Sequence, residues 1–344
     1  MQPSSRVTIR DVAARAGVSV ATVSKVINDR YGVAAATLAK VRAVIDELGY
    51  EASLVAQSLR NHKTNVIGIL VADLEPFSTE LLKGAADAIR GTGYELVVYS
   101  AGGRTGDPSG WEKRYLSRLS GTLVDGAVLV TPVASLEAVP GTPVVAVDPH
   151  TGPSTVPTID SDNLRGAQLA TEHLLELGHR RIGFLAGRPD LESAELRKTG
   201  YLRALTAAGV PIDEDLIRLG AYDPEISARS ARELLTGADR PTAVFAANDI
   251  SAIATVGAAA ELGLSVPDEL SVVGFDNVPE SALCTPPLTT VDQPIREMGH
   301  RAITLLISLI SGEPEKETHI TLSTGLVVRR STRAPGATTK GGRP

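Results

Sequence analysis

The stretch TIRDVAARAGVSVATVSKVIN (residues 8–28) decides the fold of the N-terminal part of the chain. Thr8 and Ser19 are capping residue types that precede two predicted helices, Ile9–Ala16 and Val20–Asn28, and a glycine turn separates the two. Two short helices joined by such a turn form the helix-turn-helix pattern, whose second helix enters the major groove of DNA. The pattern alone leaves a DNA-binding unit and a generic small helical domain equally open.

A third predicted helix completes this head. It lies near Thr37–Leu48 and ends at Gly49, a residue type that favours helix C-caps. Apolar residues at helical spacing in all three helices predict a small common core, formed by Val12, Ala13, Ala16, Val18, Val23, Ile27, Val41, Val44, Ile45 and Leu48. A core of about 45 residues is marginal, so we expect the head to depend on a partner.

Charge is distributed unevenly along the 344 residues. Residues 1–60 contain eight Lys and Arg against five Asp and Glu, whereas the remainder contains 26 against 35. A basic head on an acidic body suggests that the head alone contacts a polyanion.

From Val66 onward, short apolar runs alternate with helical segments, as buried parallel strands do in a doubly wound α/β fold. The predicted strands are 66–72, 95–101, 126–131, 143–148, 181–187, 243–248 and 271–276. The predicted helices are 80–90, 110–119, 164–177, 194–208, 224–235 and 250–262. So many units predict two lobes with a cleft between them, and ligands of open α/β sheets bind beyond the carboxyl ends of the strands.

Composition narrows the class of protein further. The single cysteine, Cys284, excludes a disulfide framework and a multi-cysteine zinc site. The N-terminus lacks the apolar core of a secretory signal, and apolar stretches such as Ile303–Ile310 are too short to span a bilayer. We therefore expect a soluble, cytoplasmic protein without membrane association.

Catalytic motifs are missing from the sequence. It contains no dinucleotide-binding fingerprint after the first strand, no phosphate-binding P-loop, no nucleophile elbow and no histidine pair at metal-ligand spacing. His173 and His179 stand six residues apart, which suits a structural role. The sequence predicts no enzyme, no cofactor and no metal.

Several ordered motifs resemble those of LacI/GalR-family transcription regulators. They are residues 8–28, Leu48-Gly49-Tyr50, 55–60 (VAQSLR), 173–182 (HLLELGHRRI), Ala247-Asn248-Asp249, 271–276 and 286–291 (PPLTTV). The likeness extends to about Arg330. It implies a small all-α helix-turn-helix head followed by an α/β core that resembles periplasmic sugar-binding proteins, with two doubly wound lobes. The domains expected are 1–52 (head), 53–64 (hinge helix and linker), 65–330 (effector-binding and dimerisation core) and 331–344 (disordered tail).

The DNA-binding candidates combine physical fit with this resemblance. Val20, Ala21 and Lys25 lie on the second helix without being needed for the core, and they match the positions at which the family reads bases. Short hydroxyls suit phosphates, which fix register without reading sequence. The full predicted set is Ser19, Val20, Ala21, Thr22, Ser24, Lys25, Asn28, Leu59 and Arg60.

The resemblance also implies a hinge helix, 53–60, that enters the minor groove. Leu59 matches the apolar wedge that kinks the central step of a palindromic site; the alternative is an exposed linker leucine. Three positions depart from the family pattern. Ala52 replaces a frequent proline, Gln57 replaces a common arginine, and Ala34 replaces the usual serine cap of the third helix.

By motif position, the effector-binding candidates are Phe77, Asp148, Ser193, Arg197, Tyr222, Asn248 and Asp276. Such carboxylates, amides and a guanidinium supply acceptors and donors for sugar hydroxyls, while aromatic rings pack on C–H faces. Arg197 and Asp276 are the strongest candidates. For Ser193 and Asp162, helix capping is the favoured interpretation, and Phe275 and Trp111 are expected to pack in the core.

The sequence thus predicts a homodimeric repressor that a small molecule releases from a palindromic operator, and the family resemblance implies that this molecule is a sugar. No leucine heptads follow Arg330, which disfavours a coiled-coil tetramer. The stretch GRPDLESAELRKTGY (187–201) resembles xylose- or xylan-responsive relatives. A global regulator with a protein co-repressor is the alternative, and a periplasmic solute-binding protein is disfavoured by the head.

Overall fold

The computed structural model describes residues 7–27, 31–50, 63–102, 111–119, 123–133, 142–150, 155–313 and 317–336. Contacts divide the chain into two compact units. The first contains the three N-terminal helices, and the second contains every later helix and strand that the structure describes. Each unit is described by itself.

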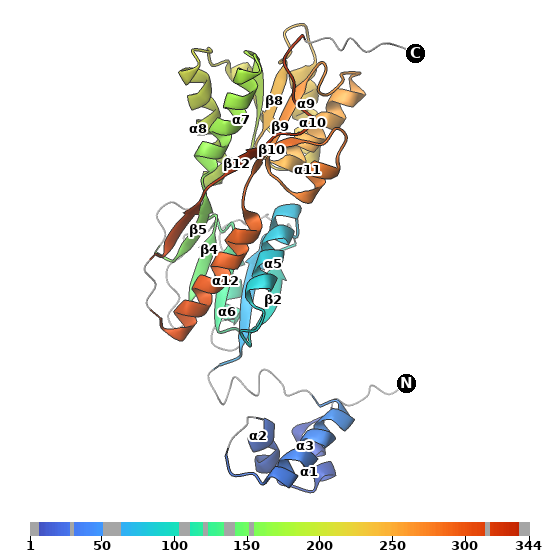
Figure 1. Ribbon diagram of the computed structural model, residues 1–344, viewed down its shortest axis with the longest axis vertical. Helices are drawn as coiled ribbons and strands as arrows, with labels where there is room; N and C mark the ends of the chain where they lie inside the picture. Colours follow the sequence, from blue (N-terminus) through green and yellow to red (C-terminus); the bar gives the residue numbers. More distant parts are fainter. Residues whose placement is uncertain are drawn as a thin grey trace. The chain divides into compact units, whose positions relative to one another are not determined.

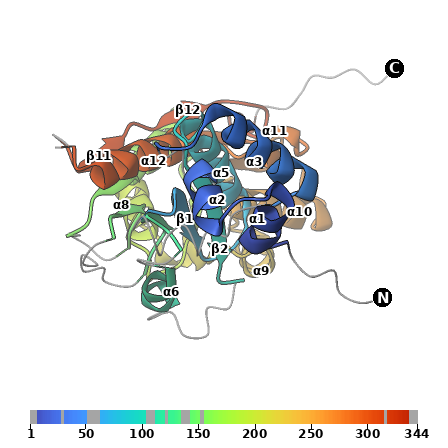
Figure 2. The ribbon, with the colours of Figure 1, turned by 90° about the horizontal axis from the view of Figure 1, so that it is seen from below.

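The first unit is a bundle of three short helices, α1 (Ile9–Ala16), α2 (Val20–Ile27) and α3 (Ala35–Leu48) (Figure 2). The Asp11 carboxylate accepts hydrogen bonds from the Thr8 backbone N–H and hydroxyl, both at 2.7 Å, and thereby fixes the start of α1. Gly17 ends α1 with φ +64°, a left-handed conformation that costs glycine little. The predicted helix-turn-helix is confirmed, with α3 beginning two residues earlier than expected.

The head encloses its own small core. Seven side chains are buried, namely those of Val12, Ala13, Ala16, Val23, Val26, Val41 and Val44. Val18, Ile27, Ile45 and Leu48, predicted for the same core, are partly buried against it. Valine and alanine dominate because three helices of 8, 8 and 14 residues can approach closely only over small side chains.

The second unit consists of two lobes, each built on one six-stranded sheet (Figure 1). The first sheet has the order β11-β5-β4-β3-β1-β2, and all its pairings are parallel. Its strands are β1 (Val66–Val71), β2 (Glu95–Ser100), β3 (Gly126–Val130), β4 (Val144–Val147), β5 (Thr158–Ser161) and β11 (His319–Leu322). Its helices are α5 (Pro76–Ala88), α6 (Trp111–Leu119) and α12 (Ile295–Ser311).

The second sheet has the order β12-β10-β9-β8-β6-β7, in which only β12 is antiparallel to its neighbour. Its strands are β6 (Ile182–Ala186), β7 (Ile217–Leu219), β8 (Ala243–Ala246), β9 (Ser271–Asp276), β10 (Thr289–Asp292) and β12 (Gly325–Val327). Its helices are α7 (Asn163–Glu176), α8 (Glu192–Ala207), α9 (Pro224–Leu235), α10 (Asp249–Glu261) and α11 (Pro279–Leu283), with a short 3-10 turn at Glu214–Leu216.

All seven predicted strands and the two doubly wound lobes are confirmed. Five further strands escaped prediction, because β5 (TIDS), β7 (IRL), β10 (TTVD), β11 (HITL) and β12 (GLV) are short and several are polar. The apolar stretch Ile303–Ile310 belongs to α12, which packs on the first sheet. No helix in the described ranges is long and apolar enough to cross a membrane.

The chain passes between the lobes three times within its described part, after β5, after β10 and after β11. Asp162, Gln293 and residues 323–324 lie in these crossings. The first lobe is held together by α5 and α12, which approach very closely: a Cβ on Gly84 would meet the Arg296 carbonyl oxygen at 1.9 Å, and one on Gly299 would meet that of Leu81 at 2.2 Å. Three thin crossings between two rigid sheets are what a hinged pair of lobes requires.

The predicted disordered tail is wrong for its first residues. Ser331 is fully buried and its hydroxyl donates to the Val272 carbonyl at 2.6 Å. His179 Nε2 lies 2.9 Å from the Arg333 carbonyl oxygen, and His173 Nε2 lies 3.0 Å from Thr332 Oγ1. The two histidines therefore have the expected structural role, because they contact the polar segment 331–333, whose composition predicts disorder. Residues 337–344 of the predicted tail lie outside the described residues.

Candidate functional site

One face of α2 is exposed and the other forms the core of the head. Val23 and Val26 are buried, whereas Val20 is 40% exposed, and Ala21 and Lys25 are exposed as well. An apolar side chain on the surface of so small a domain is available for contact with a partner. The arrangement is the one expected of a recognition helix, in which side chains near the N-terminal end face the bases.

The predicted phosphate contacts also have a structural role. Ser19 Oγ accepts the Thr22 backbone N–H at 3.1 Å and lies 2.9 Å from Thr22 Oγ1, so it caps α2. Ser24 is half-buried. Asn28, Leu59 and Arg60, together with the hinge helix predicted at 53–60, lie outside the described residues. DNA binding by these side chains stays a prediction.

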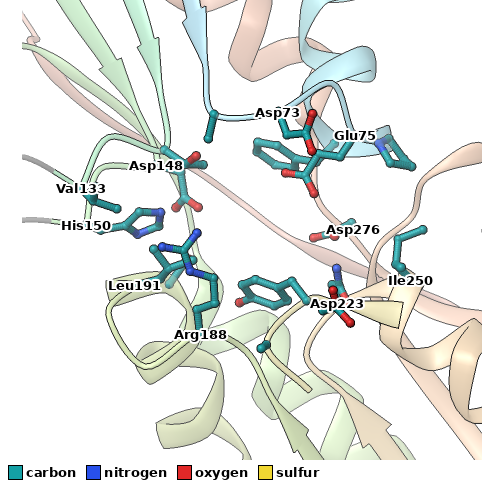
Figure 3. A pocket seen from close by; sticks show the side chains of 18 of the residues that line it. Asp73, Glu75, Val133, Asp148, His150, Arg188, Leu191, Asp223, Ile250 and Asp276 are labelled. Atoms are coloured by element: carbon teal, nitrogen blue, oxygen red, sulfur yellow. The ribbon is translucent and has the colours of Figure 1, made fainter. Parts of the chain in front are cut away.

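A cavity of about 480 Å³ lies between the two lobes of the second unit (Figure 3). Its lining comes from the carboxyl ends of strands in both sheets, as the topology of open α/β sheets predicts. All seven predicted effector residues line it: Phe77, Asp148, Ser193, Arg197, Tyr222, Asn248 and Asp276. The volume falls within the range of small-molecule sites, about 300–1,000 Å³.

Several lining residues have left-handed backbone conformations. The φ angles are +47° at Thr131, +49° at Asp148, +60° at Tyr222 and +111° at Asp276. Side chains other than glycine rarely adopt such values, and residues that do so gather at functional sites, at a cost of about 1–3 kcal/mol each. Each follows or ends a strand, where the turned backbone directs the side chain toward the cavity.

Arg197 on α8 is the centre of the cavity's polar network. It is 3% exposed, and its Nη1 donates to the Ala247 carbonyl at 2.5 Å and to Asp276 Oδ1 at 3.2 Å. Nε donates to Asn163 Oδ1 at 2.8 Å, and Nη2 donates to Gln293 Oε1 at 3.0 Å. The guanidinium thus connects α8, the first residue of α7 and the crossing after β10.

The network extends to the other lobe and to an aromatic ring. Asn163 Nδ2 donates to Asp148 Oδ1 at 3.3 Å, and Asp148 belongs to the first lobe. The Arg197 guanidinium lies 3.7 Å from the ring centroid of Phe275, which is fully buried. Phe275 is therefore a core residue as expected, and the face of its ring also packs against the guanidinium. These contacts leave Arg197 few rotamers and hold it in place before any ligand arrives.

Burial raises the pKa of Asp276 to about 7, and the neighbouring Arg197 guanidinium opposes this rise. Burial also raises the pKa of Tyr222 to about 12, so its hydroxyl keeps its proton at neutral pH. His150, which follows β4, has its pKa lowered by burial. At neutral pH the cavity therefore presents a neutral imidazole, a phenol and a carboxyl group that titrates near neutrality.

Helix capping explains some predicted residues and not others. Asp162 caps α7 by accepting the Arg165 N–H at 2.9 Å, as expected. The capping interpretation of Ser193 is wrong, because Leu191 occupies the N-cap of α8 and Ser193 lies two residues further on, buried and lining the cavity. Asn248 does both: it caps α10 by accepting the Ser251 N–H at 2.9 Å, and it lines the cavity.

Other lining residues escaped prediction. The polar ones are Asp73, Glu75, Glu112, Thr131, His150, Arg188 and Asp223. Asp73 and His150 closely follow strands, so strand-end position alone could have indicated them. Trp111 packs edge-on against Tyr115 at 6.0 Å, as a packing residue does, yet it also lines the cavity, which corrects the expectation that it is core alone. Nothing in the sequence of α6 pointed to the cavity.

Among the described residues, no group of three or more His, Cys, Asp or Glu side chains is placed to hold a metal ion. The cavity chemistry is that of a binding site: fixed donors, acceptors and rings. A helix-turn-helix head joined to a two-lobed core of this kind defines the class of ligand-responsive DNA-binding regulators.

Comparison with known proteins gives the family. Residues 8–53 match the model of bacterial regulatory proteins of the lacI family, and residues 171–332 match a periplasmic binding protein-like domain. The chain is 36% identical over 332 residues to the HTH-type transcriptional repressor PurR of Pectobacterium carotovorum, covering 94% of this chain and 96% of that protein. It is 37% identical to PurR of Yersinia pestis over 94% and 96%. The chain belongs to the LacI family and is a transcriptional repressor with a DNA-binding domain, not an enzyme.

Solved structures agree with this assignment. The lac repressor dimer bound to operator and the anti-inducer ONPF is 31% identical, with a TM-score of 0.81 over 96% of this chain and all of that one. The complex of the transcriptional regulator CelR with cellobiose is 34% identical, with a TM-score of 0.69 over 95% of this chain and all of that one.

Proposed function

We propose that this protein represses transcription by binding a palindromic operator as a homodimer, and that a small, hydroxyl-rich effector in the interlobe cavity releases it. The observation that carries the proposal is the gathering of seven motif-predicted side chains from both lobes around one cavity. Closure of the lobes on a ligand would move the crossings at Asp162 and Gln293, and Arg197 contacts the second of these directly.

Operator recognition rests on the exposed face of α2. Lys25 can donate to guanine O6 and N7, and the methyl groups of Val20 and Ala21 can pack against thymine methyls. A single helix of this size reads too few bases to select one site in a genome, so two heads on two half-sites are needed. Leu59, as an apolar wedge, would kink the centre of the palindrome.

Coupling requires a segment that is stable only with DNA. A hinge helix at 53–60 would be only marginally stable by itself, because the hydrogen bonds of so short a helix do not offset the unfavourable free energy of nucleation in water. A change in the separation of the two cores would then unwind the pair of hinge helices and release the operator. The coupling is reciprocal, so operator must weaken effector binding by the same factor.

The dimer has its own support in exposed apolar side chains of the core. Leu283 is 81% exposed on α11 and Leu262 is 41% exposed just after α10. Large apolar side chains at such exposure favour burial against a partner. Leu283→Asp is expected to shift sedimentation from dimer toward monomer, whereas Leu219→Asp, at another exposed leucine (47%), should leave the dimer intact. Equal behaviour of the two variants would contradict this interface.

A sugar is the ligand class that the cavity favours. Carboxylates, amides and a guanidinium match several hydroxyls at once, and the rings of Phe77, Trp111 and Tyr222 can pack on C–H faces. The same three rings could stack on a planar purine base, which makes such a base the competing class. A protein co-repressor is the alternative that leaves the cavity unused; the polar network of Arg197 argues for a small ligand instead.

The deciding experiment is a thermal-shift panel of D-xylose, D-glucose, cellobiose, hypoxanthine and guanine, with release of operator DNA as the second readout. A ligand at about 100 times its Kd stabilises the folded protein by about 2.7 kcal/mol, enough to raise the unfolding midpoint measurably. A sugar that both stabilises the protein and releases operator supports the proposal. A purine base that alone does so, or no response to any of the five, contradicts the sugar.

A further inference from the structure

We propose that Glu112 is a specificity-determining residue of the cavity, whose unpartnered carboxylate oxygen accepts a hydrogen bond from a hydroxyl of an uncharged polyol and excludes anionic analogues. The inference rests on the proposed function of the cavity as the effector site. It goes further by naming a residue outside the motifs and by fixing the charge of the ligand.

Glu112 is held at the start of α6 in a defined orientation. Glu112 is only 1% exposed, and its Oε1 accepts a hydrogen bond from the backbone N–H of Val133 at 3.1 Å. Both residues line the cavity. The carboxylate is therefore anchored at one oxygen by the segment that follows β3, and it cannot swing out to solvent.

The second carboxylate oxygen of Glu112, Oε2, has no hydrogen-bond donor in the described part of the chain, unlike Oε1. Glu112 Oε2 is buried and has no hydrogen-bond partner among the described residues. A buried carboxylate oxygen without a donor is costly, and buried polar groups that remain unsatisfied in native structures call for an explanation. A donor supplied by a ligand in the cavity is the explanation that the lining position of Glu112 offers.

Two further side chains around the cavity have buried polar atoms with unsatisfied hydrogen-bonding capacity. Both ring nitrogens of His150 are buried without a partner among the described residues. The Tyr222 hydroxyl is buried too and makes no hydrogen bond of normal geometry there, although the nearby Ser193 side chain lowers its pKa. His150 lies beside Val133 and Asp148 on the wall of the first lobe (Figure 3). A neutral imidazole offers one donor and one acceptor, a phenol offers both, and Glu112 offers an acceptor only. A molecule with several hydroxyl groups, each both donor and acceptor, satisfies all three.

The charge of the lining excludes anions. Its carboxyl groups are those of Asp73, Glu75, Glu112, Asp148, Asp223 and Asp276, the last of which has a pKa of about 7. The two lining arginines are already engaged: Arg188 binds Asp190 through two hydrogen bonds at 2.5 and 3.1 Å, and Arg197 binds Asp276. A phosphate or carboxylate on the ligand would therefore meet acceptor oxygens rather than an unengaged guanidinium.

Glu112→Gln is the variant that tests the role. The amide keeps an oxygen for the Val133 N–H but turns a donor toward the cavity in place of an acceptor, with nearly the same shape. Hydrogen bonds to charged groups contribute about 1.5–3 kcal/mol, so affinity for a neutral sugar should fall by about 10- to 150-fold. Affinity for an acidic analogue should rise or stay unchanged, which reverses the order of preference.

The measurement is calorimetric titration of the full chain with D-glucose, cellobiose and D-xylose, and with D-glucuronate and glucose 6-phosphate as anionic counterparts. Lys113→Gln is the matched control, since it places the same amide on the next, exposed residue of α6. It should bind every probe as the parent does. Thermal midpoints without ligand show whether each variant is folded, and Glu112→Asp, which keeps the charge, should retain the preference for neutral sugars if Glu112→Gln is unstable.

The outcomes separate the two proposals. A selective loss of neutral-sugar binding in Glu112→Gln supports the role of Glu112. Equal loss for neutral and anionic probes means that the residue is structural only and overturns the inference, while the cavity stays the effector site. Tight binding of glucuronate or glucose 6-phosphate by the parent also overturns it. If no probe binds the parent, and Arg197→Ala does not alter operator release, the proposed function itself fails.

Discussion

The two functional surfaces of this protein are built in opposite ways. The face of α2 is exposed, formed by neighbouring residues of one short helix, with Val20 40% accessible and Lys25 open to solvent. The interlobe cavity is buried, formed by residues as far apart as Ala72 and Asp276, with Arg197 in four hydrogen bonds. The difference fits the proposed partners: DNA is a large external surface, whereas a small ligand must be enclosed to be bound selectively.

This contrast has consequences for mutation. A change of Val20, Ala21 or Lys25 on the exposed face of α2 is expected to alter contact with DNA without disturbing the head, because these side chains lie outside its core. A change in the cavity is expected to alter ligand response and stability together, because the proposed ligand-binding groups also make hydrogen bonds between segments of the two lobes. The following predictions test that separation, from the largest effect to the smallest.

Arg197→Ala should have the largest effect. It removes one partner of a buried ion pair and takes a donor from Asp276 and from the amide oxygens of Asn163 and Gln293, which costs about 3–5 kcal/mol in the free energy of unfolding. Operator binding should persist at temperatures where the core is folded, but no effector should release it. Arg165→Ala is the control, because its pair with Glu172 is exposed and should cost less than about 1 kcal/mol.

Denaturant unfolding and operator release are the measurements for this pair of variants. A normal release by effector in Arg197→Ala would mean that the cavity is not the effector site. Stability losses of equal size in the two arginine variants would show instead that the buried network does not hold the core.

Lys25→Ala tests the other surface. It should weaken binding to the cognate operator by about 1–3 kcal/mol, with much less effect on random-sequence DNA, because a base contact is lost rather than a general charge. Lys113→Ala, an exposed lysine of the second unit, should leave both affinities unchanged. Fluorescence anisotropy at fixed salt measures the difference. An equal loss of affinity for cognate operator and for random-sequence DNA would show that Lys25 contacts phosphates and does not read bases.

Asp276 predicts a pH dependence confined to the cavity. With its pKa near 7, the carboxyl ionises as pH rises from 6 to 8 and becomes a better acceptor for a sugar hydroxyl. Sugar affinity should therefore increase by about tenfold over this interval, as expected for one linked proton. Asp276→Asn should abolish the increase, since the amide does not titrate. A pH dependence that survives in the variant would assign the titration to another group.

The same carboxyl has a second, opposite pH effect on stability. Its pKa is higher in the folded chain than in the unfolded chain, so the folded state holds the proton more tightly. The contribution of Asp276 to the free energy of unfolding is therefore present at about pH 4 and falls as pH rises through about 7. Asp276→Asn should flatten this part of the stability profile in denaturant titrations.

Ala34→Ser should have the smallest effect, and it should be favourable. Ala34 occupies the N-cap of α3 and provides no side-chain hydrogen bond. A serine there can accept a backbone N–H of the first turn and should stabilise α3 by about 1 kcal/mol. Ala39→Ser, at an exposed position within α3, should instead be slightly destabilising. Hydrogen exchange of α3 amides in the full chain distinguishes them; slower exchange in both would contradict the capping argument.

Sequence patterns predicted the head almost to the residue. The capping residues and Gly17 mark the helix ends, and these are local signals between neighbours in the chain. In the core, the apolar runs predicted seven strands, but polar β5 and β10 lacked any such run and were missed. Composition alone predicts a disordered tail from Ser331, because it does not reveal that His179 and Val272, far away in sequence, satisfy the polar groups of the tail.

The cavity shows the same division. Motif position identified seven lining residues. Six of them lie at or just after a strand end or at a helix start, and Arg197 lies in the second turn of α8. Glu112 and Trp111 gave no such signal: they open an amphipathic helix, and only the packing of α6 against the first sheet brings them to the cavity. The sequence by itself therefore determined the class, the two-part organisation and the residues at strand ends. The tertiary structure alone decided which buried polar atoms have hydrogen-bond partners and which do not, because burial depends on contacts between segments that are far apart in the sequence.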